Sequence, residues 1–273
     1  MNSNIATTSA YIDLIRTRTP LPLGRLLRAY RMEAKFEMLS ALRTASFALP
    51  FIIVPIAIYL LFGVVINGDV DQTSGLGAGV HNYLFSGFSA MAVMMPGIFI
   101  GVILATERDS GLLNLKRSLP QPPGATIIAK VLMSMGVSAI ALTLVVVAAL
   151  IAGKITLSST QVATIWLVLV IGAIPFTAIG LLIGSLVSAS AAPAYGNLIF
   201  LPMLWLSGLF IPLPAFLKHW VVIWPAFHLN QLALGLAGVE QFTFIPPALA
   251  GAVLVGVTVI CGGIAIRRLA RVG

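Results

Sequence analysis

Long apolar runs separated by short polar segments dominate the chain after its first 44 residues. Each run lacks charged side chains and approaches or exceeds the ~20 residues that a helix needs to cross a roughly 30 Å hydrocarbon core. We therefore expect six membrane-spanning helices, at residues 45–66, 83–106, 131–153, 162–187, 194–211 and 243–266. The fourth and fifth are divided at residues 188–193, where small residues and a proline favour a tight connection.

A different pattern precedes the first span, because apolar and basic positions form two stripes at helical spacing. Leu26, Leu27 and Tyr30 lie on one stripe, and Arg28 and Arg31 lie on the other. This pattern predicts a helix in the inner membrane interface, acting as an anchor, as a partner contact or as both. The expected organisation is a mobile cytoplasmic tail at 1–20, an amphipathic helix at 21–44 and one transmembrane domain at 45–273.

The segment 212–241 allows two interpretations. Most of it is uncharged, but Pro225, His228 and nearby amide side chains interrupt the apolar pattern. We interpret it as a re-entrant hairpin of two short helices on the outer side, broken near Pro225. The alternative is an ordinary outer loop lying on the membrane.

Composition supports an integral membrane protein. Charged residues make up 9% of the 273 residues, whereas a soluble domain has about 25%. The net charge of +8 would suggest nucleic acid in a soluble protein, but the basic residues flank the apolar runs, so we expect no nucleic-acid partner. Fourteen of the 16 Lys and Arg residues fall on one side of a six-span topology, and only Lys154 and Lys218 fall on the other. This bias predicts that both termini are cytoplasmic.

Several function classes lack their motifs. No G-x-x-x-x-G-K-[ST] loop occurs, so the chain has no usual means of cradling nucleotide phosphates. All eight acidic residues lie outside the predicted spans, which argues against an ion-coupled carrier. The three histidines are too scattered to suggest a metal site or a catalytic triad. We therefore expect neither an enzyme nor a bound cofactor in this chain.

The charged connection at 107–130 stands out between two spans. Charges end the second span, Gly111 allows a turn, leucines give a short apolar face, and three prolines precede the third span. A short amphipathic helix between two rigid spans could seat in a groove of a cytoplasmic partner. The alternative interpretation is a plain inner loop.

The chain resembles the permease subunits of ABC-2 type transporters, over nearly its whole length. The resemblance rests on ERDSGL at 107–112 followed by Ser118-Leu119-Pro120, on SGLFIP at 207–212, and on WPAFH at 224–228. Asp109 and Leu112 depart from the commoner Glu and Thr of the first motif.

The resemblance implies roles for specific residues. It implies an elbow helix before span one, a coupling helix between spans two and three, and paired short outer helices before span six. ATPase coupling would involve Glu107, Arg108, Gly111, Leu112, Leu115, Lys116, Arg117 and Leu119. Arg28, Arg31 and Glu33 would act on the elbow helix, and Ser207, Gly208, Pro212, Pro225 and His228 in the outer region.

The expected function is that of the membrane subunit of a bacterial ABC exporter in the cytoplasmic membrane. Two copies of a separate ATPase would bind ATP and Mg²⁺, and a second permease, identical or related, would complete the pathway. Spans without charges suit an amphiphilic or hydrophobic cargo such as a drug, an antibiotic, a peptide or a lipid. The alternatives are export of a lipid-linked glycan, ion-coupled transport, and a membrane scaffold without transport activity.

Overall fold

A computed structural model of the protein describes most of the chain. The described residues are 23–66, 79–118, 122, 124–210, 218–239 and 242–272. For Arg117, Lys218, His219 and Val272 it describes the backbone alone. Every regular element within these ranges is a helix, as predicted. The predicted tail at 1–20, together with Leu119 and Pro212, lies outside the described residues.

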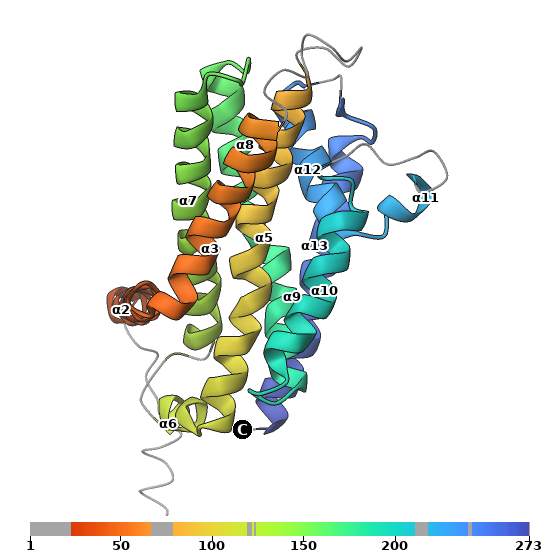
Figure 1. Ribbon diagram of the computed structural model, residues 1–273. Coiled ribbons are helices and arrows are strands. Elements are labelled where there is room, and N and C mark those ends of the chain that lie inside the picture. The colour runs from red at the N-terminus through yellow and green to blue at the C-terminus, as the bar shows by residue number, and fades with distance from the viewer. Residues whose placement is uncertain are drawn as a thin grey trace, which may run out of the picture.

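The helices form an upright bundle with one helix lying across it (Figure 1). The amphipathic helix α2 lies across the others near one end, and the short α6 lies at that same end beside the C-terminus (Figure 1). The elements are α2 (Leu23–Arg43), α3 (Ala45–Ile58), the π-helix η1 (Tyr59–Ile66), α5 (Gly79–Asp109), α6 (Leu112–Ser118), α7 (Ala125–Ala152), α8 (Ser159–Ile171), α9 (Ala173–Leu186), α10 (Ala192–Leu206), α11 (Lys218–Val221), α12 (Pro225–Leu236) and α13 (Pro247–Val272).

Five helical segments of the described chain are long and apolar enough to cross a membrane. They are Ala45–Ile66, Gly79–Asp109, Ala125–Ala152, Ser159–Leu186 and Pro247–Arg271. The fifth predicted span, at 194–211, corresponds to α10, which has 15 residues. At 1.5 Å per residue α10 is about 22 Å long, shorter than a roughly 30 Å core. A multi-pass membrane protein is confirmed, and the count of six spans stays a prediction.

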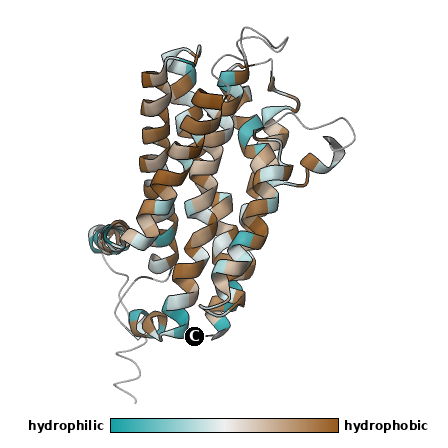
Figure 2. Cartoon of the chain, in the orientation of Figure 1, coloured by the Kyte–Doolittle hydropathy of each residue, from teal (hydrophilic) through white to brown (hydrophobic). Residues whose placement is uncertain are grey.

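The central helix of the bundle is α5. Almost every residue from Gly79 to Ile98 is buried, as expected for a helix enclosed by others, and the buried set includes polar side chains such as Asn82 and Ser86. The helices α3 and α13 are peripheral and expose apolar side chains along their length. Hydrophobic residues accordingly extend along the outside of the bundle, and hydrophilic ones gather at its ends (Figure 2).

Two predicted spans are less regular than their sequences indicate. The fourth consists of α8 and α9, which meet at Gly172. The first passes from α3 into η1, and the buried Tyr59 ring at this junction packs edge-on against Phe85 and Phe88 at 6.4 and 6.0 Å. Such helical irregularities occur frequently at functional positions. Pro55 precedes the first junction and Pro175 follows the second, but the apolar residues around both prolines favour a continuous span.

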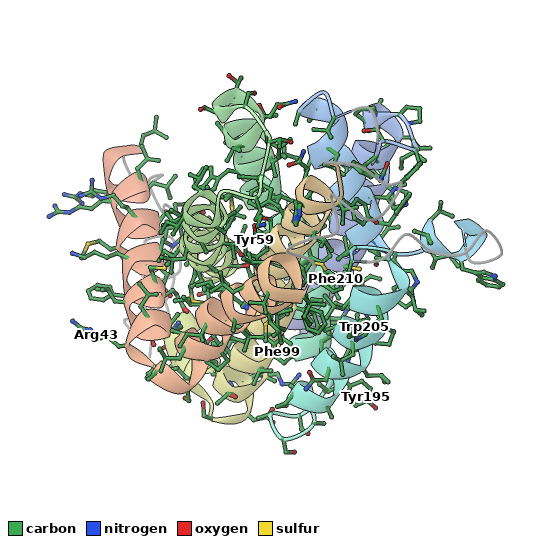
Figure 3. The ribbon with its side chains drawn as sticks, turned by 45° about the horizontal axis from the view of Figure 1, so that its top comes forward. Arg43, Tyr59, Phe99, Tyr195, Trp205 and Phe210 are labelled. Atoms are coloured by element: carbon green, nitrogen blue, oxygen red, sulfur yellow. The ribbon has the colours of Figure 1, made fainter. Side chains whose placement is uncertain are left out.

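A glycine gives the end of a methionine side chain room between α2 and α7. The terminal methyl group of Met38 lies so close to Gly136 that a Cβ atom there would be 1.9 Å away. Leu23 and Leu27 lie on the same side of α2 as Met38 but near its N-terminal end, where they are exposed. At the C-terminal end of α2, the exposed Arg43 points away from the bundle (Figure 3).

Aromatic rings attach α10 to α5. Phe210 stacks on Phe88 with ring centroids 4.4 Å apart, and Phe200 contacts Phe99 edge-on at 6.0 Å. Trp205 lies beside Phe210 at the end of α10, with 5.9 Å between ring centroids (Figure 3). These contacts give α10 a defined position although much of its outer surface is exposed.

Candidate functional site

A tight reversal of the chain joins α5 to α6. Gly111 adopts a left-handed conformation with a φ of 76°, which glycine takes without the steric cost paid by other residues. Its amide donates to the carbonyl of Arg108, and its carbonyl accepts from the amides of Asn114 and Leu115 at the start of α6. The predicted short helix after Gly111 therefore exists, and it spans Leu112–Ser118.

The helix α6 has one buried apolar side chain and two exposed ones. Leu113 packs into an apolar cluster with Leu104 of α5, Met133 of α7 and Leu269 of α13. Leu112 and Leu115 remain 40% and 61% exposed. The buried leucine fixes α6 to the bundle, and the other two provide an apolar surface that nothing in the described chain covers.

Five charged side chains from four helices, α6 among them, meet where α6 contacts α2, α5 and α7 through ion pairs. We call Glu33 and Glu37 of α2, Glu107 of α5, Lys116 of α6 and Lys130 of α7 the charge cluster. The Lys116 ammonium contacts Glu37 closely and lies 3.4 Å from both Glu33 and Glu107. The Lys130 ammonium lies 2.8 Å from Glu107 and 3.3 Å from Glu37. One set of ion pairs thus connects the interfacial helix, two bundle helices and α6.

Burial makes these contacts more consequential than ion pairs on a surface. Lys130 is fully buried, and the side chains of Glu37, Glu107, Glu33 and Lys116 are 6%, 11%, 13% and 18% exposed. A buried ion pair barely repays the cost of removing its charges from water, but removing one partner leaves an uncompensated charge. The charge cluster is therefore sensitive to the loss of any single member.

The pKa values reflect this balance. Burial alone would raise the pKa of Glu37, but the combined attraction of Lys130 and Lys116 outweighs burial and holds that pKa below its ordinary value of 4.5. For Lys116, burial favours the neutral amine, yet the hydrogen bond to Glu37 and the charges of the three carboxylates raise its pKa above the ordinary 10.5. Both groups are therefore charged at neutral pH.

Arg108 and Asp109 face a different part of the molecule from Glu107. The Arg108 guanidinium donates to the carbonyls of Gly184 at 3.0 Å and Val187 at 2.7 Å, at the C-terminal end of α9. Asp109 accepts a hydrogen bond of 2.7 Å from the amide of Ala189 and pairs with Arg108 at 3.0 Å. A cation at a helix C-terminus and an anion on a free amide are both favourable. These contacts fix the end of α5 to the connection between α9 and α10.

Close packing of α5 against α9 reinforces that attachment. The two helices meet at Gly97 and Gly101 on α5 and Gly180 and Gly184 on α9. A Cβ atom at any of these four positions would lie 2.3–2.7 Å from an atom of the other helix. The small-residue spacing that allows close approach between membrane helices is therefore used within this chain.

The structure distributes the residues predicted for coupling over three environments. Glu107 and Lys116 belong to the charge cluster, Arg108 contacts α9, and Leu112 and Leu115 are exposed on α6. Arg117 is in α6, but its side chain is outside the described set, as is Leu119. Of the predicted elbow residues, Glu33 joins the charge cluster, whereas Arg28 and Arg31 are exposed. Their roles in coupling stay predictions.

Sequence reasoning missed Glu37 and Lys130 as site residues. Ala129-Lys130 belongs to the motif behind the family resemblance, and Lys130 also counts among the basic residues that flank a span, but neither observation predicts that it is fully buried. A signal for Glu37 was available, because Glu33 and Glu37 are four residues apart and share one face of a helix. Two carboxylates on one face of a helix lying against apolar spans require nearby cations.

The outer residues contribute to a neutral polar network at the opposite end. Tyr83 donates to the carbonyl of Gly208, and the Ser207 hydroxyl donates to the Met203 carbonyl within α10. His228 lies within hydrogen-bonding distance of the Val222 carbonyl, at 2.8 Å. Pro225 occupies the first turn of α12, where a missing amide hydrogen costs nothing. The structure contains the two short helices α11 and α12 here, and a re-entrant hairpin stays a prediction.

Two comparisons with known proteins bear on this arrangement. A sequence model of the family described as "ABC-2 type transporter" matches residues 29–244, which include the whole charge cluster and α6. The chain is also 28% identical over 177 residues to a Bacillus subtilis (strain 168) protein named "Putative transport permease YvfS". That alignment covers 64% of this chain and 71% of the relative.

Proposed function

The chain belongs to the ABC-2 type transporter family, and we propose that it is the permease subunit of an ATP-driven exporter. The predicted resemblance is thereby confirmed, and a role as a transporter permease follows from the family. Beyond the family assignment, we propose a direction of transport, a cargo and an assembly. In the proposed assembly, two copies of a separate ATPase bind ATP and Mg²⁺, and a second permease copy or paralogue completes the pathway.

The position of α6 is the observation that carries the proposal. Its exposed Leu112 and Leu115 offer an apolar contact to a cytoplasmic ATPase, while Lys116 points the other way into the charge cluster. A movement of α6 would act directly on α2, α5 and α7 through the ion pairs of that cluster. Arg108 would extend the same movement to α9 through its hydrogen bonds to Gly184 and Val187.

The topology proposed here places α6, α2 and both termini on the cytoplasmic side of a bacterial inner membrane. The inward bias of Lys and Arg supports this orientation. Membrane-spanning segments without acidic or basic residues in their central parts support an amphiphilic or hydrophobic cargo. A lipid-linked glycan is the second candidate, because its lipid portion fits the same surfaces.

A pair of variants separates ATPase contact from transmission of movement. Replacing both Leu112 and Leu115 with Ala should weaken co-purification of the ATPase subunit, since it removes the exposed apolar surface. Lys116→Met should leave co-purification intact and uncouple ATP hydrolysis from transport, because the ammonium faces the cluster. Reversing the charges of both Lys116 and Arg117 should also uncouple ATP hydrolysis from transport. Lys116→Glu would add a fourth carboxylate beside three others, so Met is the cleaner change.

The control on the same helix is Asn114→Ala, which alters an exposed polar side chain. It should change neither property. The measurements are pull-down of the ATPase and ATP-dependent uptake of a fluorescent amphiphile into inverted vesicles. Normal transport in Lys116→Met would contradict the coupling role, and transport without any ATPase would favour an ion-coupled carrier.

A further inference from the structure

A hollow of about 370 Å³ opens between α9, α12 and α13. Its walls include Gly172 and Pro175 at the start of α9, Leu232 of α12, and Gly251, Leu254 and Thr258 of α13. The volume falls within the range of sites that bind small molecules. The helix α12 lies at the end of the bundle opposite α6, so this hollow is distinct from the charge cluster (Figure 1).

The depth of the hollow places it beside the hydrocarbon of the bilayer. Its lining on α13 runs from Gly251 to Val259, about 12 Å along the helix axis, beginning four residues after the start of α13 at Pro247. Both α13 and the α8–α9 pair are long enough to cross a membrane. The medium at the mouth of the hollow is therefore the acyl chains of the leaflet opposite α6.

Two glycines that line the hollow differ in the space beside them. At Gly172 a Cβ atom would lie 2.1 Å from the Leu229 side chain, so a larger residue there would displace that side chain of α12. At Gly251 the nearest atom to such a Cβ would be the Leu232 methyl group, at 4.0 Å. The hollow therefore has room for a larger residue at Gly251.

The lining favours an apolar occupant. Almost all of it is aliphatic, and its one polar side chain, Thr258, already donates its hydroxyl hydrogen to the Leu254 carbonyl. A water molecule needs two to four polar partners, and this surface does not offer them. An empty hollow would forfeit dispersion contacts that a neighbouring hydrocarbon chain can supply.

We propose that one acyl chain of a bilayer phospholipid occupies this hollow and packs between α12 and α13. The concave wall gives the chain more contacts than the flat surface of a single helix, so this lipid exchanges more slowly than its neighbours. The bound chain fills the space between Leu232 of α12 and Gly251 of α13 and supports the position of α12. The inference does not depend on the direction or the cargo of transport.

Filling the hollow tests the proposal. Gly251→Leu places a side chain in the space, and Gly256→Leu makes the same change on the same helix where nothing lies within 4 Å and no hollow exists. The full-length protein is reconstituted in nanodiscs of phosphatidylcholine carrying a diazirine within one acyl chain. After irradiation, labelled peptides are quantified by mass spectrometry.

The wild-type protein should be labelled preferentially on the α12 and α13 segments that line the hollow. Gly251→Leu should reduce this labelling about tenfold, equivalent to about 1.4 kcal/mol or the burial of about two methylene groups. Gly256→Leu should label like wild type. Equal labelling of all three proteins, or labelling spread evenly over the bundle, would each overturn the proposal.

A second measurement guards against misfolding of Gly251→Leu. Returning phosphatidylcholine to delipidated protein should raise the apparent melting temperature of the wild type and of Gly256→Leu. It should raise that of Gly251→Leu much less, and Gly251→Leu without lipid should melt at or above the delipidated wild type. A Gly251→Leu protein that responds fully to lipid contradicts the inference.

Discussion

The two ends of the bundle are held together by different chemistry. At the α6 end, the five residues of the charge cluster form ion pairs across four helices. At the opposite end, neutral hydrogen bonds join the described helices: Ser86 donates to Asn230, Asn82 bonds Thr156 at 2.9 and 3.0 Å, and Gln231 bonds the backbone of Phe242 and Phe244.

The difference indicates which end can transmit a force. A neutral hydrogen bond is short-ranged and directional, so it holds one arrangement and is lost when its partners move apart. Charges attract over longer distances in a poorly solvated region, and each lysine here serves two or three carboxylates. The charge cluster can therefore shift and stay paired, whereas the opposite end is suited to fixing α12 against α5.

Removing the fully buried lysine should produce the largest effect. Lys130→Met leaves Glu33, Glu37 and Glu107 with Lys116 as the one remaining cation of the charge cluster and should destabilise the protein by about 3–5 kcal/mol. The measurement is thermal unfolding in detergent followed by intrinsic fluorescence. Lys35→Met, at an exposed position of α2, is the matched control and should change little. A small effect at Lys130 would erase the contrast between the two ends.

Breaking a neutral contact at the other end should cost less. Asn230→Leu leaves the buried Ser86 hydroxyl without its acceptor and should destabilise by about 1–3 kcal/mol. Replacing both residues, with Ser86→Ala and Asn230→Leu together, should recover part of the loss. An additive double variant, measured by the same unfolding assay, would show that the two side chains are not coupled.

The turn before α6 should show a smaller effect, confined to one end. Gly111→Ala meets no neighbouring atom but forces a positive φ on alanine, at a cost of about 1–2 kcal/mol. Gly256→Ala, in regular helix and equally free of neighbours, should instead be neutral or slightly stabilising. Hydrogen exchange of α6, measured by mass spectrometry, should accelerate only in Gly111→Ala. Acceleration in both would mean that glycine content, and not the turn, controls α6.

A change of pH should affect the melting temperature through one end of the bundle and not the other, and this is the smallest of the expected effects. The lowered pKa of Glu37 means that its ion pairs contribute fully above about 4.5 and are lost as pH falls through the folded-state value. The difference in melting temperature between wild type and Glu37→Gln should therefore shrink as pH falls below about 4.5. The difference in melting temperature between wild type and Asn230→Leu should stay constant over that range. If it shrinks in the same way, the two ends do not differ in their response to pH.

The sequence predicted helix positions well where local pattern determines them. The helix expected at 21–44 is α2 at Leu23–Arg43, because its striped pattern separates a side packed on the bundle from an exposed basic side. The short helix after Gly111 was also expected, because a glycine followed by leucines and prolines marks a turn and a bounded helix.

Contacts between distant segments were not predictable in the same way. Lys130 meets Glu37 only because α2 lies across α7, and no local pattern specifies that crossing. The break at Gly172 is equally hidden, since an apolar residue on either side of it reads as continuous span. The position of the break is linked to Leu229 of α12, because the Leu229 side chain occupies the space beside Gly172.

The glycine contacts between α5 and α9 have a mechanical consequence. Because backbone atoms of the two helices interlock at four positions, sliding one along the other would force a collision within a fraction of a helical turn. The pair should move as a single stiff rod. In a conformational change of the transmembrane domain, α5 and α9 would then keep their relative position. The helices α3, α10 and α13 would be the ones that move around them.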